Sequence, residues 1–457
     1  MRTPLLAGAL FVLSAACGSS SEPSASPAAA DPGKIGPDAG DRPPEVNPEA
    51  GIPDSPVAPP PLAPGAVDPS FGTNGVVTGT LDHTPTVHFS RDGRTALFHK
   101  RTDGVARLTE LLANGAVDKT QGASGLATFP IPNATNEQFS LLASARVESD
   151  GSVFLFGGLK TSGANYAPFV GRVKGGGLDS TFGNSGGLWT FSDQYALVAG
   201  LVVDRDGGGA IKGFYTDVGL AHLAGATPRD ASSRVYHLTA AGTTDSAFGG
   251  GTGYFELPQR GTSAAPYADQ VVLDSSGLPL VISIPDTSHE VRRLTRAGAL
   301  DPTYGTGGIA PITWDGQAAF RVNAIALAKG GLLAVLYNDV SSRLVRLTAN
   351  GGVADAFPGS PTRDVPDAYL EVVDELADGR LLLFRHDANG KTTLERWRAD
   401  GKPDTAFGTA GKVDVTALIG SGAGVLAIGV TSTGATMLAA GKDTGITTDW
   451  SVRRLGP

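Results

Sequence analysis

The hydrophobic positions of this chain fall into short runs, and glycine, aspartate or asparagine separates one run from the next. Between residues 307 and 348 the runs are GGIAPIT, NAIALA, GLLAVLY and SRLVRLT. Each run is too short for a helix and is rich in leucine or in β-branched residues. The pattern therefore predicts four short β-strands joined by turns.

The same pattern recurs seven times between residues 65 and 457. Each copy carries a turn with an aspartate, as in VDPSFGTNGV at 67–76 and LDSTFGNSGG at 178–187, and we call this stretch the Asp turn. Ala354 replaces its aspartate in one copy, Gln121 its aromatic residue in another, and Pro358 the following glycine in one. The aspartate positions are 50 to 66 residues apart, and a period of this size indicates a repeat architecture.

Two further features repeat in phase with the Asp turn. Most copies end on a basic residue followed by an apolar one, such as Arg172–Val173 or Arg293–Leu294. A glycine turn lies in the middle of every copy, at Gly93, Gly151, Gly207, Gly277, Gly330, Gly379 and Gly434. One four-stranded unit cannot bury both of its faces, so neighbouring units must stack. We therefore predict an all-β fold, a seven-bladed β-propeller with four strands per blade; an open solenoid is the alternative.

These repeated features resemble the delta-60 repeat, a family of tandem units in secreted and surface proteins of bacteria. The resemblance rests on the Asp turn, the mid-unit glycine turn and the basic strand end, and it covers residues 65–457. The sixth copy matches the pattern least. The resemblance implies a propeller-like fold and no particular activity.

The N-terminus has the composition of an export signal. After Arg2 comes the apolar run LLAGALFVL at 5–13, and Cys17, the one cysteine of the chain, follows it closely. This arrangement resembles a bacterial lipoprotein signal, although Ser14 stands where such signals usually have leucine. We expect residues 1–16 to be the signal peptide, Cys17 to be lipidated, and Gly18 to direct the protein to the outer membrane of the cell envelope. A conventional signal peptide cut nearby is the alternative.

Residues 17–64 differ in composition from the rest of the chain. Positions 18–64 hold 13 prolines together with serine, alanine and glycine, and almost no hydrophobic periodicity. Such a segment cannot bury enough apolar surface to offset its conformational entropy. We expect the lipidated cysteine and a disordered tether at 17–64, and the propeller at 65–457.

Charge and reactive residues give little sign of chemistry. The formal net charge is −9 and no block of lysine or arginine occurs, which argues against a nucleic-acid partner. Ser185, in FGNSGG, resembles a hydrolase nucleophile but occupies a variable position of the Asp turn. The histidines are scattered. We predict no catalytic residue, no metal site and no cofactor.

The repeated residues are expected to be structural. The aspartate should close a turn with the Ser or Thr two places on, its basic partner should link blades, and the aromatic residue should fill the seam between blades. These structural positions are Asp68, Phe71, Asp118, Asp179, Phe182, Asp245, Phe248, Asp301, Tyr304, Asp404 and Phe407.

Binding is expected on the opposite side of the ring. Taking the Asp turns as links between blades, the strand order places them and the glycine turns at one end. The links of variable length, notably 158–168, 213–233 and 441–449, emerge at the other end, where recognition usually lies. Aromatic residues in or beside these links are candidate ligand-binding residues: Tyr166, Trp189, Tyr215, Tyr267, Trp314 and Tyr369.

The sequence thus favours a monomeric, membrane-tethered interaction module that binds an envelope or extracellular protein or a glycan. Two alternatives stay open at this point. One is a structural protein of the envelope, and the other is an extracellular hydrolase that acts on glycans, which would require two carboxylates converging at one channel mouth.

Overall fold

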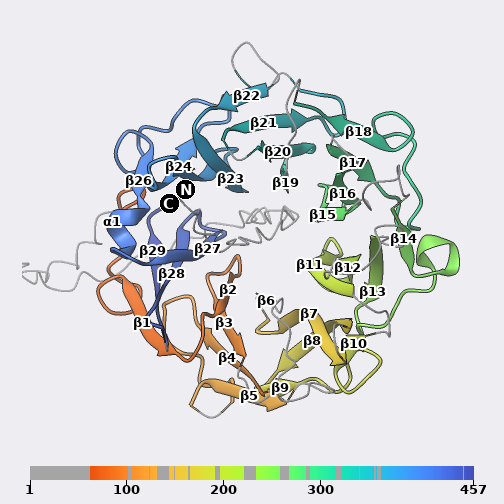
Figure 1. The fold of residues 1–457 in the computed structure, drawn as a ribbon, viewed down its shortest axis with the longest axis horizontal. Helices are drawn as coiled ribbons and strands as arrows, with labels where there is room; N and C mark the ends of the chain where they lie inside the picture. Colours follow the sequence, from red (N-terminus) through yellow and green to blue (C-terminus); the bar gives the residue numbers. More distant parts are fainter. Residues whose placement is uncertain are drawn as a thin grey trace, which may run out of the picture.

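A computed structural model describes residues 62–457, except for 101–104, 123, 131–143, 149, 163–164, 191–195, 221–232, 258–266, 285–288, 315–320, 339, 355–356, 358–361 and 446. Antiparallel β-sheets dominate the described chain and are arranged in a ring (Figure 1). Two short helical segments of the described chain interrupt them, the 3-10 helix η2 (Phe248–Gly251) and α1 (Val415–Ile419).

Seven sheets form the ring, and we number them as blades I to VII in chain order. Within blades I to VI the strands follow one another from the first to the fourth. Blade I contains β2 (Thr86–Phe89), β3 (Thr95–Lys100), β4 (Val105–Leu111) and β5 (Leu126–Pro130). Blade II contains β6 (Ser144–Val147), β7 (Val153–Ser162), β8 (Asn165–Lys174) and β10 (Leu188–Thr190), with the short β9 (Gly177–Leu178) beside β8.

The next three blades repeat this order. Blade III contains β11 (Ala196–Arg205), β12 (Ile211–Leu220), β13 (Arg234–Thr239) and β14 (Tyr254–Glu256). Blade IV contains β15 (Tyr267–Leu273), β16 (Pro279–Ile284), β17 (His289–Arg293) and β18 (Ile309–Ile312). Blade V contains β19 (Arg321–Ala326), β20 (Leu332–Tyr337), β21 (Ser342–Leu347) and β22 (Thr362–Val365).

The last two blades close the ring. Blade VI contains β23 (Ala368–Glu375), β24 (Leu381–Asp387), β25 (Thr392–Trp397) and β26 (Lys412–Asp414). Blade VII contains β27 (Gly424–Val430), β28 (Thr436–Asp443) and β29 (Thr448–Leu455). Its fourth strand is β1 (Val76–Leu81), which pairs antiparallel with β29 from Val76 opposite Arg453 to Leu81 opposite Thr448. The predicted seven-bladed β-propeller is therefore confirmed, and the open solenoid is wrong.

The predicted position of the Asp turns within a blade is wrong. We expected them to join the last strand of one blade to the first strand of the next. The structure places them inside a blade, between its third and fourth strands, as Asp301 lies between β17 and β18. Each blade therefore takes its fourth strand from the next sequence copy, which leaves β1 to complete blade VII.

The turn between the first and second strands is the same in every blade. The glycine N–H donates to the carbonyl three residues earlier, for example from Gly93 to Ser90 and from Gly434 to Thr431, at 3.0 and 2.9 Å. Glycine suits this position because φ lies near +80°, as at Gly434 (φ +81°). In blade III the glycine with this role is Gly209 (φ +84°), not the predicted Gly207.

The hydrophobic core lies between the blades. Buried hydrophobic residues form seven clusters, and each cluster contains residues from two neighbouring blades. The cluster of Phe154, Phe182 and Phe214, for example, joins blade II to blade III. Because each blade buries both faces against its neighbours, the ring depends on every seam.

The segment just before β1 completes the last seam. The Gly65 N–H donates to the Gly456 carbonyl at 2.9 Å, and the Gly408 N–H of blade VI donates to the Pro64 carbonyl at 3.0 Å. Packing on the propeller thus begins at least one residue before position 65. None of the described helices is long and apolar enough to cross a bilayer.

Candidate functional site

In the six Asp turns that contain an aspartate, its carboxylate oxygens hold the turn. In blade II, Oδ1 of Asp179 accepts hydrogen bonds from the Thr181 N–H at 3.0 Å and the Thr181 hydroxyl at 2.6 Å. Oδ2 accepts from Arg172, whose Nη2 lies 2.7 Å away. Partial burial raises the pKa of Asp179, but the bonds from Thr181 and the charge of Arg172 outweigh it and hold that pKa below its ordinary value.

The same arrangement recurs around the ring with small changes. Oδ1 of Asp68, Asp118 and Asp301 accepts from the residue two places on in the same way. Oδ2 accepts from a basic side chain in each case: Arg454 for Asp68, Arg94 for Asp118, Arg172 for Asp179, His237 for Asp245, Arg293 for Asp301 and Arg396 for Asp404. The main ion pair therefore closes a turn within one blade, whereas we had expected it to link two blades.

The link between blades comes from the two residues at the end of the Asp turn. The Phe182 ring is 1% exposed and lies so close to Gly242 of blade III that a Cβ there would come within 2.4 Å of the ring. The Gly183 N–H donates to the Ala241 carbonyl of blade III at 2.8 Å. Arg293 adds a bond to the next blade, from Nη1 to the Ala349 carbonyl at 2.8 Å. These residues hold the ring together.

The strand order gives the propeller two different faces. The turns from first to second strand and the Asp turns lie on one face, which we call the turn face. The links from second to third strand and from one blade to the next lie on the other, the link face. Moving the Asp turns inside the blades leaves this division as predicted. The predicted link 213–233 is shorter than expected, because β12 continues to Leu220. Parts of the three predicted links lie outside the described residues, namely 163–164, 221–232 and 446.

Two of the six candidate aromatic residues are buried. Trp189 is 1% exposed, packs against Tyr236 at 5.2 Å between ring centroids, and donates from Nε1 to the Thr244 hydroxyl at 2.9 Å. Tyr215 is also 1% exposed and lies 4.5 Å from the His237 ring. Burial raises the pKa of Tyr215 above its ordinary value. Their burial argues against the predicted ligand-binding role of these two residues, because both rings fill seams of blade III.

Two other candidates lie at the link-face end of blade V. The Trp314 ring is half-buried, and the guanidinium of Arg343 lies 5.6 Å from its centroid. Arg343 also forms a bidentate ion pair with Asp364, at 2.6 and 2.9 Å. The Arg343 bond lowers the pKa of Asp364, so this carboxylate is ionised at neutral pH, and its side chain is 53% exposed.

Tyr369 lies on the other side of the same blade end. Its ring meets Tyr337 edge to face, with 4.6 Å between centroids and an angle of 81°, and its hydroxyl bonds to Glu371. Val340, in the turn between β20 and β21, is 62% exposed. We call Trp314, Tyr337, Val340, Arg343, Asp364 and Tyr369 the blade V patch. Blade V occupies the top of the ring in Figure 1, where β19 to β22 are labelled.

The remaining candidates are not described. Cys17 and the expected signal and tether up to residue 61 lie outside the described residues. The side chains of Tyr166 and Tyr267 also lie outside them, although their backbone belongs to β8 and β15. Among the described residues, no group of His, Cys, Asp or Glu is arranged to hold a metal ion.

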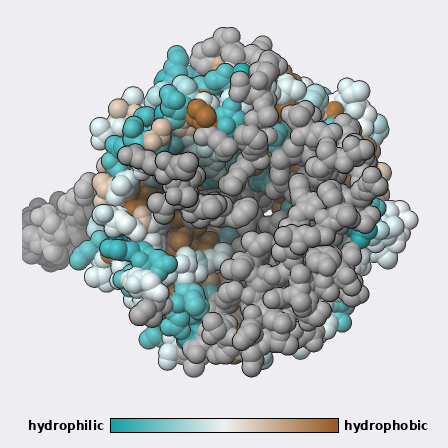
Figure 2. Space-filling view, in the orientation of Figure 1, coloured by the Kyte–Doolittle hydropathy of each residue, from teal (hydrophilic) through white to brown (hydrophobic). Residues whose placement is uncertain are grey.

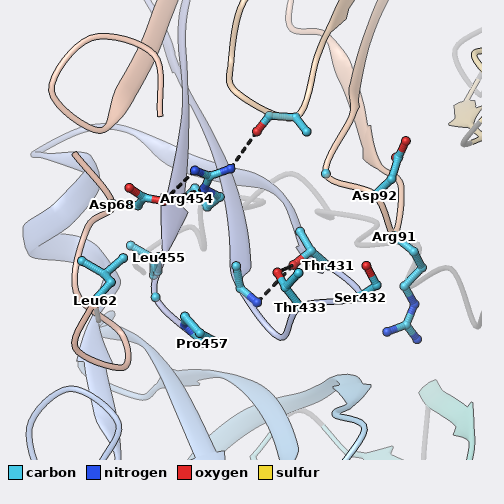
Figure 3. Close-up of a pocket in the computed structure, with 14 residues that line it drawn as sticks. Leu62, Asp68, Arg91, Asp92, Thr431, Ser432, Thr433, Arg454, Leu455 and Pro457 are labelled. Atoms are coloured by element: carbon cyan, nitrogen blue, oxygen red, sulfur yellow. Dashed lines mark hydrogen bonds and ion pairs between the residues drawn. The ribbon is translucent and has the colours of Figure 1, made fainter. Parts of the chain in front are cut away.

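A cavity of about 390 Å³ opens on the turn face between blades VII and I (Figure 3). The turn Thr431–Ala435 and the residues around Arg454 come from blade VII, and Arg91, Asp92 and Ala113 come from blade I. Figure 3 shows the Asp68 carboxylate beside the Arg454 guanidinium at one side of the cavity and the three hydroxyl residues Thr431, Ser432 and Thr433 together at another. The sequence analysis did not predict this cavity.

Comparison with known proteins supplies no family. No model of a known protein family matches the chain, and no curated protein shows significant similarity to it. The resemblance to the delta-60 repeat therefore stays a prediction.

Solved structures resemble the chain only distantly. Prolyl oligopeptidase B from Galerina marginata matches with 12% identity and a TM-score of 0.47 over 83% of this chain and 49% of its own, so the chain spans about half of that enzyme. Virginiamycin B lyase from Staphylococcus aureus matches with 13% identity and a TM-score of 0.39 over 82% of this chain and 98% of its own. The lectin BP39L from Burkholderia pseudomallei matches with 14% identity and a TM-score of 0.44, covering 82% and 99%.

Proposed function

We propose that this protein is a lipid-anchored β-propeller of the cell envelope that binds an extracytoplasmic protein or glycan through its link face. The observation that carries the proposal is the contrast between the two faces. The turn face is built from seven closely similar turns closed by backbone bonds, whereas the link face carries the links of variable length and the blade V patch.

The blade V patch has the chemistry of a recognition surface. Trp314, Tyr337 and Tyr369 offer half-buried rings, which can stack on a sugar or a peptide plane at little cost in side-chain entropy. Asp364 offers a half-exposed ionised carboxylate that can accept hydrogen bonds from hydroxyl or amide groups, and Val340 adds exposed apolar surface. Rings with a few charged groups beside them are typical of ligand sites.

The anchor and the location of the protein rest on the sequence. A lipidated Cys17 followed by the proline-rich segment would hold the propeller at the membrane and leave the link face free to bind. In the view of Figure 2, hydrophilic residues lie at the left edge of the described ring, together with residues of intermediate hydropathy.

The experiment is a pull-down from envelope fractions with the propeller, residues 62–457, as bait. A Trp314→Ala/Tyr369→Ala double variant should lose most of the captured protein or glycan while its thermal unfolding stays cooperative. The matched control is Lys119→Ala, an exposed change on the turn face, which should capture as well as the unmodified protein. Equal capture by the double variant, or loss only in the control, would contradict the proposal.

The pull-down tests the first alternative, and an incubation with polysaccharide tests the second. A structural envelope protein would retain its partners in the double variant, since such contacts would not depend on two aromatic rings. A glycan-active hydrolase would release shortened products from an envelope polysaccharide incubated with the unmodified propeller. Either result would replace the binding proposal.

A further inference from the structure

The cavity on the turn face is lined by the carboxylate of Asp68. This carboxylate has one arginine partner fewer than Asp404, its counterpart in blade VI. In blade VI, Oδ2 of Asp404 accepts from two arginines, from Nε of Arg396 at 2.7 Å and from Nη1 of Arg380 at 2.9 Å. In blade VII, Oδ2 of Asp68 accepts from Arg454 at 2.7 Å, and Arg454 is the counterpart of Arg396. Among the described residues, blade VII has no counterpart of the Arg380 guanidinium.

Blade VII lacks this second arginine because of one position, in the turn between the first and second strands of each blade. The residue after the turn glycine is Arg94 in blade I, Arg380 in blade VI and Ala435 in blade VII. Both arginines extend to the aspartate of their own Asp turn, Arg94 to Asp118 at 3.0 Å and Arg380 to Asp404. Ala435 ends at Cβ, and both it and Asp68 line the cavity. The cavity therefore includes the space that a guanidinium occupies in two other blades.

The charges around the cavity leave Asp68 able to bind a cation. Arg454 is held by Asp68 and by the Ala113 carbonyl at 2.8 Å (Figure 3). Arg91 is paired with Asp374 of blade VI at 3.0 Å. Partial burial raises the pKa of Asp68, but the bonds from Ser70 and Arg454 hold that pKa below its ordinary value. Asp68 is thus ionised at neutral pH. Asp92, whose side chain is 38% exposed, brings a second carboxylate to the cavity from blade I.

We propose that this cavity binds an alkylguanidinium group, either a free small molecule or an arginine side chain of a partner. The guanidinium would lie where Arg380 lies in blade VI, with one N–H donating to Oδ2 of Asp68. Thr431, Ser432, Thr433 and Asp92 also line the cavity, and the planar fork of a guanidinium can reach several acceptors at once. Thr431 and Thr433 bond to each other at 2.9 Å and Asp92 pairs with Arg94 at 3.4 Å, so Asp68 is the main acceptor for the ligand. A volume of about 390 Å³ corresponds to roughly a dozen waters, enough for the group and its alkyl chain.

The first test measures binding of agmatine, an alkylguanidinium without a carboxylate, by calorimetry to the propeller at residues 62–457. Saturable binding is expected. Ala435→Arg fills the space from within, so it should weaken agmatine binding at least tenfold and raise the melting temperature without ligand. The matched control is Ala210→Arg, which adds the same charge after the turn glycine of blade III and should leave agmatine binding unchanged.

Two more variants keep the test decisive if Ala435→Arg does not fold. Ala435→Met fills the space without charge, and Asp68→Asn removes the charge without filling it; each should weaken agmatine binding at least tenfold. No binding to the unmodified propeller, or equal binding to these variants, would overturn the proposal.

Two further ligands define the chemistry and its source. A diamine of the same length should bind at least tenfold more weakly than agmatine, because an ammonium lacks the planar fork; equal binding would contradict a guanidinium site. A capped arginine peptide that binds more tightly than agmatine would identify a partner side chain, and the reverse order a free small molecule. The site lies on the turn face, so it stands independently of the proposed link-face function.

Discussion

Replacing Phe182 by alanine should destabilise the propeller by opening the seam between blades II and III. The ring is 1% exposed and lies 5.9 Å from the Phe154 centroid and 5.8 Å from that of Phe214. Buried Phe→Ala changes cost about 3–5 kcal/mol in transfer free energy and cavity formation. The backbone of Gly242 cannot fill the hole, because glycine has no side chain to extend into it. We therefore expect a loss of about 4 kcal/mol.

The assay is urea denaturation followed by tryptophan fluorescence and circular dichroism, together with the pull-down at a temperature where the variant is folded. Capture should then match that of the unmodified protein, because Phe182 supports the fold and lies away from the link face. Leu178, a half-buried residue at the edge of the neighbouring seam, gives a milder comparison as Leu178→Ala. A Phe182→Ala variant of unchanged stability that no longer captures partners would refute the structural role of the Asp turn.

Three other predictions concern ionisation, closure and the anchor. Burial raises the pKa of Asp217 to about 6, above its unfolded value. The penalty that its ionisation imposes on folding is therefore absent below about pH 4, grows between about pH 4 and 6, and reaches about 3 kcal/mol at pH 7. Asp217→Asn should thus be more stable than the unmodified protein in urea denaturation at pH 8, and a less stable variant would contradict this. Deleting the chain from residue 402 removes strands of blades VI and VII, so it should give aggregation or rapid proteolysis; a soluble, protease-resistant product would count against the closed ring. Cys17→Ser should move the protein from the membrane fraction to the soluble one, and unchanged fractionation would exclude a lipid anchor.

The number of blades could be predicted from the sequence because every copy repeats the same turn residues in phase. The pairing of strands could not be read from the copies alone. A repeat does not show whether the run after Asp301 pairs with the strand before it or with the strand after it. The structure pairs β18 with β17, although the connection 294–308 between them is longer than the link from β18 to β19, so connection length does not predict this pairing.

The candidate site was less accessible to sequence reasoning. Trp189 and Tyr215 stand in strands beside variable links, but their burial depends on which neighbouring blade their side chains face. Tyr337 ends a run of apolar residues and gives no signal of exposure in the sequence. Ala435 does give a signal, since Arg94 and Arg380 occupy its place in two other copies. That comparison acquires meaning only once the structure shows that both arginines bind the aspartate of their blade.

The central claim is that binding occurs on the link face while the turn face holds the fold. Hydrogen exchange of the propeller, measured alone and with the partner recovered in the pull-down, tests it directly. The account predicts new protection at the link-face end of blade V, in residues 337–343 and 368–371, with exchange in the turns at 206–209 and 274–277 unchanged. Protection confined to those turns and to the Asp turns, with none at blade V, would contradict it.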